Sequence, residues 1–242
     1  MIFHLDGTAP DTPFPNPELA TRDPDGLLSV GGDLSRTRLL QAYSQGIFPW
    51  YSDGQPILWW SPDPRTVLYP GDIHVSRSLK RRLRKGGLEL RLDTAFNAVT
   101  EACAEPRDTQ DGTWLLPEMR AAYAELHRSG DAHSIELWRN RELVGGMYGI
   151  AMGGAFFGES MFSRVTDASK IVMVYLAEQL QEHGFRFLDC QVFNPHLASM
   201  GAVEIPRSRF LTELEAALTL QPASSLWQQP PLDCQKLAHA ET

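Results

Sequence analysis

Residues 134–191 constrain the fold more than any other part of this chain. Three strand-like runs lie between residues 134 and 163, separated by two short turns. A helix is expected over 167–183, and it must be buried because it is apolar nearly all round between residues 171 and 177. Another strand-like run follows over 185–191. Strands that flank a buried crossover helix predict an α/β fold with a mixed sheet.

Polar side chains end the two strands on either side of this helix. The run 153–163 carries Glu159 where the strand is expected to leave the core, and the strand after the helix ends in Asp189-Cys190-Gln191. A carboxylate in such a place needs a partner, a ligand or water. These residues therefore predict the lip of a pocket.

The same residues have a structural interpretation as well. Asp189 and Gln191 are two positions apart and are expected on one face of their strand, with Cys190 in the core on the other face. A shared site on that face is one interpretation. A set of structural hydrogen bonds, including a cap for the helix near Ser169, is the other.

The N-terminal region differs from the rest. Pro-rich, irregular sequence begins at Phe14, and one helix is expected between Ser35 and Gly46. Four Trp and Tyr side chains then lie close together among prolines, which predicts rigid aromatic loops without regular structure. These four are Trp50, Tyr51, Trp59 and Trp60. A small core under the loops is the simplest role for most of them.

Two domains are expected, a small N-terminal one over residues 1–62 and a larger one over 63–242. In the larger domain, Asp93 is expected to cap one helix, and another helix begins at Pro117. The tail over 219–242 shows no clear helix or strand pattern.

A basic helix is expected after Ser76, with six cations among the nine residues 77–85. Leu79 and Leu83 fall on one side of it. The other side is cationic and consists of Arg77, Lys80, Arg81 and Arg84. A solvated face would normally carry interleaved acids, and this one has none, which favours a phosphate backbone as its ligand. With the tryptophans, which can stack bases at roughly 1–3 kcal/mol each, the helix favours an RNA end.

Composition restricts the remaining possibilities. The net charge of −8 gives no general sign of nucleic-acid binding, so such a role depends on a local patch. The N-terminus lacks a signal-peptide pattern, and no apolar run is long enough to span a bilayer. Three widely spaced cysteines without a C-x-x-C pair favour reduced thiols in the cytoplasm and give no zinc spacing. The sequence also has no Walker loop and no G-x-G-x-x-G, so no metal or cofactor is expected.

Many longer motifs lie in a fixed order along the chain. They are Gly26-Leu27-Leu28, Gly31-Gly32-Asp33-Leu34, Gly46-Ile47-Phe48-Pro49-Trp50, the run 58–65 (LWWSPDPR), Gly112-Thr113-Trp114, His133-Ser134, Leu143-Val144-Gly145-Gly146, the run 157–163 (FGESMFS), Ala168-Ser169-Lys170, Asp189-Cys190-Gln191, the run 196–202 (HLASMGA) and Glu204-Ile205-Pro206-Arg207. Together they resemble the leucyl/phenylalanyl-tRNA–protein transferase family, over about residues 14–218.

The resemblance implies a bacterial cytoplasmic enzyme that moves Leu or Phe, and also Met, from its tRNA to a protein. The acceptor would be the α-amine of an N-terminal Arg or Lys, and the product would be marked for degradation. It also implies an N-acetyltransferase-like C-terminal domain behind a small N-terminal domain. We expect a monomer that needs no cofactor and has no membrane partner.

The resemblance also implies roles for single residues. Asp189 and Gln191 match residues assigned to catalysis, and Glu159 matches one in the active site. Trp50 and Trp114 match residues that help to hold the tRNA 3′ end. An apolar slot for the amino-acid side chain would be lined by Met147, Phe156, Met173, Leu176 and Leu188. One departure is Leu116, where the family usually has Thr; losing that helix cap should destabilise the helix by about 1 kcal/mol.

The transfer reaction does not require a strongly basic side chain among these residues. The substrate ester is already activated, and an α-amine with a pKa of about 7.7–8.0 is partly neutral near pH 7.5, so no powerful base is needed. The carbonyl of Gln191 is expected to aim the amine, with Asp189 orienting that amide. Glu159 is the candidate for sensing the cationic acceptor or for positioning the 3′ adenosine. The ribose 2′-hydroxyl is an alternative proton shuttle.

Two rival functions share some of these features. An acyl-CoA-dependent N-acetyltransferase would have the same fold, but it needs a glycine-rich pyrophosphate loop, and residues 163–170 contain no glycine. A non-enzymatic RNA-binding module would explain the basic helix and the tryptophans but not the pocket with its acids.

Overall fold

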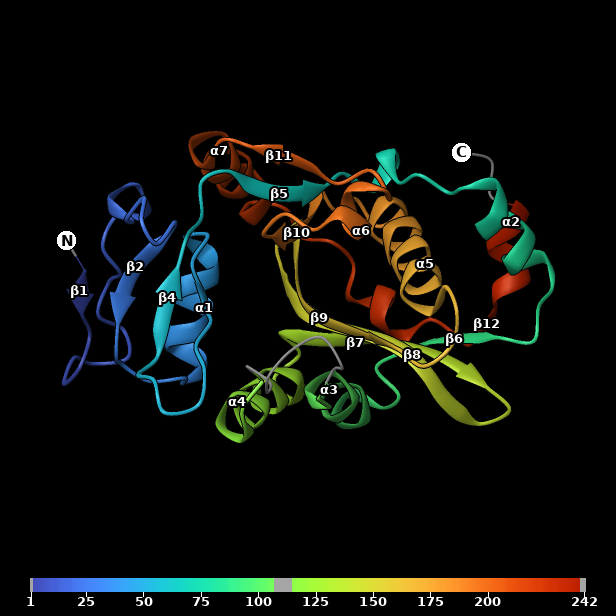
Figure 1. The fold of residues 1–242 in the computed structure, drawn as a ribbon, viewed down its shortest axis with the longest axis horizontal. Helices are drawn as coiled ribbons and strands as arrows, with labels where there is room; N and C mark the ends of the chain where they lie inside the picture. Colours follow the sequence, from blue (N-terminus) through green and yellow to red (C-terminus); the bar gives the residue numbers. More distant parts are fainter. Residues whose placement is uncertain (1, 107–114, 240–242) are drawn as a thin grey trace.

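The computed structural model describes residues 2–106 and 115–239, which form two β-sheets with helices packed around them (Figure 1). The N-terminal sheet has the order β1-β2-β4-β3. Its strands are β1 (Phe3–His4), β2 (Leu27–Val30), β3 (Phe48–Pro49) and β4 (Leu58–Trp60). Helix α1 (Arg36–Ser44) packs beside them and begins, as predicted, at Ser35, whose side chain accepts a hydrogen bond from the Arg38 amide.

The prediction of an irregular aromatic segment is wrong in part. Phe48 and Pro49 pair antiparallel with Trp60 and Trp59, so Trp59 and Trp60 belong to the sheet, whereas Trp50 and Tyr51 lie in the irregular segment after β3. The proline is tolerated because β3 is an edge strand, where a missing amide hydrogen need not break a ladder.

The second sheet has eight strands in the order β11-β5-β10-β9-β8-β7-β6-β12. They are β5 (Arg65–Leu68), β6 (Glu89–Leu92), β7 (Ala132–Arg139), β8 (Glu142–Met152), β9 (Ala155–Ser163), β10 (Phe187–Gln191), β11 (Val203–Ile205) and β12 (Leu232–Asp233). Among the described strands of this sheet, β9 and β10 are the one parallel pair, and the helix between them is the predicted buried crossover. The predicted α/β fold with a mixed sheet is confirmed.

Helices cover both faces of this sheet (Figure 1). Helix α5 (Ala168–Glu182) packs on β7, β8 and β9 from one side, and α3 (Phe96–Ala104) packs on the same strands from the other. Neighbouring residues such as Phe156 and Phe157 therefore belong to separate hydrophobic cores. The remaining helices are α2 (Arg77–Arg84), α4 (Pro117–Arg128), α6 (Pro195–Ala198) and α7 (Arg207–Leu218).

The predicted cap of α3 is wrong in its contacts. Asp93 does not cap α3; its carboxylate accepts from the Ser134 amide at 2.8 Å and pairs with His133. Glu136 on β7 instead accepts from the amides of Thr94 and Ala95, at 2.8 and 2.7 Å, and caps α3 from outside the helix.

Asp167 occupies the N-cap position of α5, at the start of the expected helix, but its side chain makes no capping bond. Its carboxylate pairs with Lys170 at 3.0 Å, and the Ser163 hydroxyl at the end of β9 accepts from the Ser169 amide at 2.9 Å. The start of α5 is thus fixed to the strand before it.

The tail after α7 is folded, contrary to the sequence pattern. The 3₁₀ helices Ser224–Gln228 and Cys234–His239 flank β12, which pairs with β6. Leu226, Cys234 and Leu237 are buried against α2 and α5. The tail closes the edge of the main sheet beside the basic helix.

Candidate active site

The parallel pair β9–β10 separates after Phe157 and Asp189. Both strands carry an irregularity at this point. On β9, Gly158 pairs with Gly149 and Ser160 with Tyr148, which leaves Glu159 as the extra residue. Bulges of this kind re-aim a side chain, and here they lie at the mouth of the opening between two strands.

The irregularity on β10 involves Gln191. Asp189 pairs with Val67 and Gln191 with Thr66, so Cys190 is the extra residue on this strand. Gln191 has φ +65°, and the Val192 amide donates to the Cys190 carbonyl oxygen at 2.8 Å, which makes a γ-turn. A non-glycine residue in this region is strained, and such strain concentrates at functional sites.

This turn corrects the prediction for Cys190. Simple alternation would put its side chain in the core, but the bulge moves it to the pocket wall, where it is partly exposed. Burial and the neighbouring Asp189 raise the pKa of the Cys190 thiol, so it is kept protonated.

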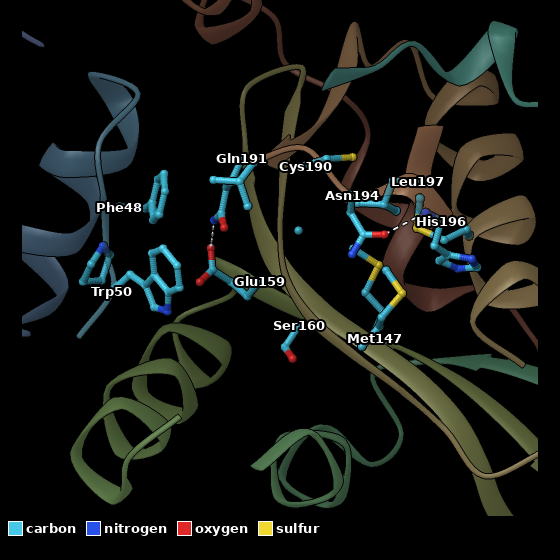
Figure 2. Close-up of a pocket in the computed structure, with 15 residues that line it drawn as sticks. Phe48, Trp50, Met147, Glu159, Ser160, Cys190, Gln191, Asn194, His196 and Leu197 are labelled. Atoms are coloured by element: carbon cyan, nitrogen blue, oxygen red, sulfur yellow. Dashed lines mark hydrogen bonds between the residues drawn. The ribbon is translucent and has the colours of Figure 1, made fainter. Parts of the chain in front are cut away.

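A pocket of about 280 Å³ occupies the opening between the strands. Figure 2 shows Glu159 and Gln191 on its wall, with Phe48 and Trp50 to one side. Figure 2 shows Met147, Leu197 and His196 on the side away from Phe48 and Trp50; Met161, which pairs with Met147 across β8 and β9, and Met173 also line the pocket and make this part mostly apolar. The pocket therefore joins a polar centre to an apolar recess.

Three donors surround the carboxylate of Glu159. The hydroxyls of Tyr43 on α1 and Tyr123 on α4 lie 2.8 Å from Oε1 and 2.6 Å from Oε2. The Gln191 amide nitrogen donates to Oε1 at 2.9 Å. Burial raises the pKa of Glu159 to about 7, although these donors oppose the rise. The bond to Glu159 turns the oxygen of the Gln191 amide away from the carboxylate.

Asp189 lies beneath this centre and is fully buried. Its two oxygens accept from Arg65 Nε and Nη2 at 2.8 and 2.6 Å, and Oδ1 also accepts from the Gln191 backbone amide at 2.9 Å. Asp189 thus holds the backbone of Gln191. The side-chain amide is oriented by Glu159, which corrects the expectation that Asp189 orients it.

Arg65 was not singled out by the sequence reasoning. It is fully buried, donates to the Gly46 carbonyl oxygen at 3.0 Å and lies over the rings of Phe48 and Phe210. The signal that points to it is Asp189 itself, because a buried carboxylate at the end of a strand needs a buried cation.

The apolar recess differs in part from the predicted slot. Met147 and Met173 line it, as expected. Phe156, Leu176 and Leu188 do not line it; they are fully buried behind the wall. Each of the three belongs to a core-facing position of β9, α5 or β10, and the split between the strands opens beyond them.

Comparison with known proteins identifies the family. A model of the leucyl/phenylalanyl-tRNA protein transferase family matches residues 67–215, and one of its N-terminal domain matches residues 32–63. Proteins named leucyl/phenylalanyl-tRNA–protein transferase are similar to this chain over most of its length. The one from Alkalilimnicola ehrlichii is 57% identical over 228 residues, 94% of this chain and 88% of that protein. The one from Nitrosomonas eutropha is 58% identical over 212 residues, 88% and 90% of the two chains. The chain belongs to this family of transferases.

Solved structures similar to this transferase are distant in sequence. One is described as L-PGS from Bacillus licheniformis, with 13% identity, a TM-score of 0.39, and coverage of 69% of this chain and 54% of that one. Another is a GCN5-related N-acetyltransferase from Kribbella flavida, with 12% identity, a TM-score of 0.35, and coverage of 67% and 58%.

Of the two tryptophans expected to hold the tRNA 3′ end, Trp50 lies at the pocket mouth and Trp114 lies outside the described residues. Trp50 is 45% exposed, lines the pocket and packs against Trp60 with ring centroids 5.9 Å apart. Trp59 is fully buried, as expected of a small core. Trp114, the second predicted tRNA contact, lies outside the described residues.

The basic helix α2 lies at the far end of the transferase from the N-terminal sheet (Figure 1). Leu79 and Leu83 are buried, as predicted. Arg77, Arg81 and Arg84 are exposed, and within the described part of the chain their guanidinium groups make no ion pair. Lys80, on the same helix, is partly buried.

Residues 2–106 and 115–239 contain neither a cluster of metal ligands nor a membrane-spanning helix. No three His, Cys, Asp or Glu side chains gather there as a metal ion would require. No helix in these ranges has the length and apolar character needed to cross a bilayer.

Proposed function

We propose that this transferase moves leucine or phenylalanine, and also methionine, from its tRNA to the α-amine of a protein beginning with Arg or Lys. The modified protein would then be marked for degradation. The observation that carries the proposal is the Gln191 amide, whose nitrogen donates to Glu159 at 2.9 Å beside the apolar recess. An acceptor oxygen and an apolar recess together suit an amine that attacks the ester of an apolar amino acid.

The recess supports an apolar side chain. Met147, Met161 and Met173 supply flexible, polarisable walls that can adjust to a branched or an aromatic group. Met147 also reaches close to Gly158, where an added Cβ would come within 2.5 Å of its terminal carbon. The glycine therefore keeps the recess open at its junction with Glu159.

The polar centre supports aiming of the amine. A carboxylate accepts and does not donate, so the bond to Glu159 assigns Nε2 of Gln191 to that contact and leaves Oε1 to accept from the acceptor amine. We propose that Gln191 is the catalytic residue that orients the nitrogen lone pair toward the ester carbonyl. Asp189 and Arg65 act behind it as positioning residues through the Gln191 backbone. Glu159, with its partial negative charge near neutral pH, also favours a cationic acceptor.

Two further regions would hold the tRNA. We propose that Trp50, and Trp114 with it, stacks on the 3′ end next to the recess. The exposed Arg77, Arg81 and Arg84 of α2, with the partly buried Lys80, would bind the phosphate backbone. The division into domains over 1–62 and 63–242 also remains our proposal, and the separate pairing of β1–β4 supports it. The reaction is proposed to run in the bacterial cytoplasm on a monomer.

The test is transfer of labelled leucine from Leu-tRNA to a peptide that begins with Arg. We expect label in the peptide, no transfer after ribonuclease treatment, and no transfer to the same peptide with an acetylated N-terminus. Acetylation of the peptide from acetyl-CoA, or tRNA binding without transfer, would instead support one of the two rival functions.

A further inference from the structure

The side-chain oxygen atoms of Glu159, Tyr43 and Tyr123 contact one another in a closed ring, which we call the carboxyl–tyrosine ring. Tyr43 Oη lies 2.8 Å from Glu159 Oε1, Tyr123 Oη lies 2.6 Å from Oε2, and the two hydroxyls lie 2.8 Å from each other. Each of these three contacts has the length of a hydrogen bond, and each needs one hydrogen atom.

The number of hydrogen atoms available for these three contacts indicates whether Glu159 is ionised. The two phenols supply two hydrogens, and burial raises the pKa of both tyrosines well above the ordinary value, so neither is ionised. An ionised Glu159 therefore leaves one contact empty, with two lone pairs facing each other. A protonated Glu159 supplies the third hydrogen and fills the ring.

The direction of the bonds follows from the neighbouring amide. The Gln191 nitrogen donates to Oε1, so the added proton belongs on Oε2. Oε2 then donates to Tyr123, Tyr123 donates to Tyr43, and Tyr43 donates back to Oε1. Every polar hydrogen of the ring is used in this arrangement, and cooperative bonding strengthens it.

We propose that Glu159 is an acid–base catalytic residue of the transfer, and that Tyr43 and Tyr123 hold one exchangeable proton on its carboxyl group. This inference rests on the proposed function. As the acceptor nitrogen bonds to the ester carbon and the bond from that carbon to the ribose 3′ oxygen breaks, the carboxyl gives its proton to the departing oxygen. The carboxylate then takes one proton from the attacking nitrogen and returns to its starting state.

The surroundings of the ring support this role. The pKa of Glu159, raised to about 7 by burial, lies close to the 7.7–8.0 of an α-amine, which suits proton exchange between them. The other ionisable groups that face the ring are Tyr148 on β8, which is buried, and Asp189 on β10, whose charge adds to the rise. Arg65 on β5 is paired with Asp189 and so offers no free positive charge to Glu159.

The charge of the free enzyme can be measured without any substrate. Infrared difference spectra between about pH 6 and pH 8.5 should show the carbonyl stretch of a protonated carboxyl that disappears with a midpoint near pH 7. Glu159→Gln should remove the part of that band that belongs to Glu159 and leave only the contribution of Glu178, whose pKa burial also raises to about 7. Glu213→Gln is the matched control, since Glu213 also accepts from a tyrosine hydroxyl, that of Tyr69 at 2.8 Å, but lies outside the pocket wall. A band of equal strength in the wild type and in Glu159→Gln, or a wild-type protein without the band at pH 6, overturns the proposal.

The role in catalysis is tested by single-turnover transfer at saturating acceptor. The wild-type protein should give a bell-shaped profile with limbs near pH 7 and pH 8, because the active state holds one proton between Glu159 and the amine. Glu159→Gln should be slower and should lose the alkaline limb, rising to a plateau with the amine alone, while Glu213→Gln should keep the bell. Identical profile shapes in the wild type and Glu159→Gln overturn the proposal but leave the proposed function intact. Absence of transfer at every pH refutes the proposed function, and the infrared titration still decides the charge of the ring.

Discussion

The pair of Arg65 and Asp189 is fully buried, so each side chain depends on the other for its charge to be tolerated. We expect Arg65→Met to lower the free energy of unfolding by about 3–5 kcal/mol, because it leaves Asp189 as an unpaired buried carboxylate. Urea denaturation followed by fluorescence measures the change. Adding Asp189→Leu to Arg65→Met should restore much of the stability but not the transfer rate, since the backbone amide of Gln191 then loses its acceptor. Wild-type stability of Arg65→Met alone would contradict this account.

Gln191 gives a second prediction at the scale of a residue. Gln191→Glu keeps the shape but replaces the donor to Glu159 by a carboxylate, 2.9 Å from another one. We expect single-turnover transfer to fall by roughly 10²-fold or more, as when an oriented polar group is lost from an active site. Gln179→Glu is the matched control, because Gln179 also donates to a glutamate, Glu182, but on the exposed side of α5. Wild-type turnover of Gln191→Glu would remove the orienting role.

The sequence identifies the polar residues of the centre but not how they meet. Glu159, Asp189 and Gln191 follow from strands that end in polar side chains. The assignment of Asp189 to the side-chain amide fails because alternation along β10 is broken by the bulge at Cys190. Tyr43 and Tyr123 were not expected at all, since they lie 116 and 36 residues from Glu159 in the chain and no local pattern links them.

At the scale of elements, helix α2 tests whether tRNA is bound through its phosphates. Replacing Arg77, Lys80, Arg81 and Arg84 by Gln should weaken binding of charged tRNA and flatten its dependence on salt. Each lost phosphate contact should reduce the slope of log K against log[salt] by roughly 0.7–0.9. Filter binding at several salt concentrations measures it. The control is the change to Gln of the exposed Arg139, at the end of β7, and of Arg141 in the turn after it. An unchanged slope would mean that α2 is only a solvated face.

The C-terminal tail gives a prediction about the same helix. The Gln235 side chain donates to the Arg84 carbonyl oxygen at 3.1 Å, and the Cys234 thiol contacts the Leu83 carbonyl oxygen at 3.7 Å, so the tail closes the end of α2. A chain that ends at Leu218 should unfold at lower urea and bind tRNA with a smaller salt slope, since α2 loses its support. A chain that ends at His239 is the control. Full tRNA affinity of the shorter chain would show that α2 does not need the tail for tRNA binding.

Elements with a strong period were predictable, and elements held by distant partners were not. The basic helix has a clear period, the buried helix has a long apolar run, and both lie where expected. Strand β12 has two residues, and its position depends on pairing with β6 more than 130 residues earlier. The cap of α3 comes from Glu136 on another strand, so the local candidate Asp93 was the wrong choice.

At the scale of the whole molecule, the two parts of the chain meet at the active site. Tyr43 belongs to α1, beside the N-terminal sheet, and Glu159 to the main sheet. Arg65 stands at the start of the first strand of the main sheet and donates to Gly46 just before β3. The site is therefore complete only when the N-terminal part is docked on the main sheet, which no single stretch of sequence could reveal.

Stability as a function of pH provides a prediction for the whole molecule that is independent of activity. Burial, with Glu182 adding to it, raises the pKa of Glu178 on α5 to about 7, compared with about 4.3 in an unfolded chain. Between these values the folded state binds more protons than the unfolded state, so this group lowers stability as pH rises through that window. The Gln side chain in Glu178→Gln stays neutral at every pH, so this variant does not lose stability through this group as pH rises. The melting temperature of the variant should therefore match the wild type near pH 4.5 to 5 and exceed it increasingly up to about pH 8. Glu215→Gln, an exposed change on α7, should track the wild type throughout. A Glu178→Gln curve parallel to the wild type would show that Glu178 is already ionised in the fold at low pH.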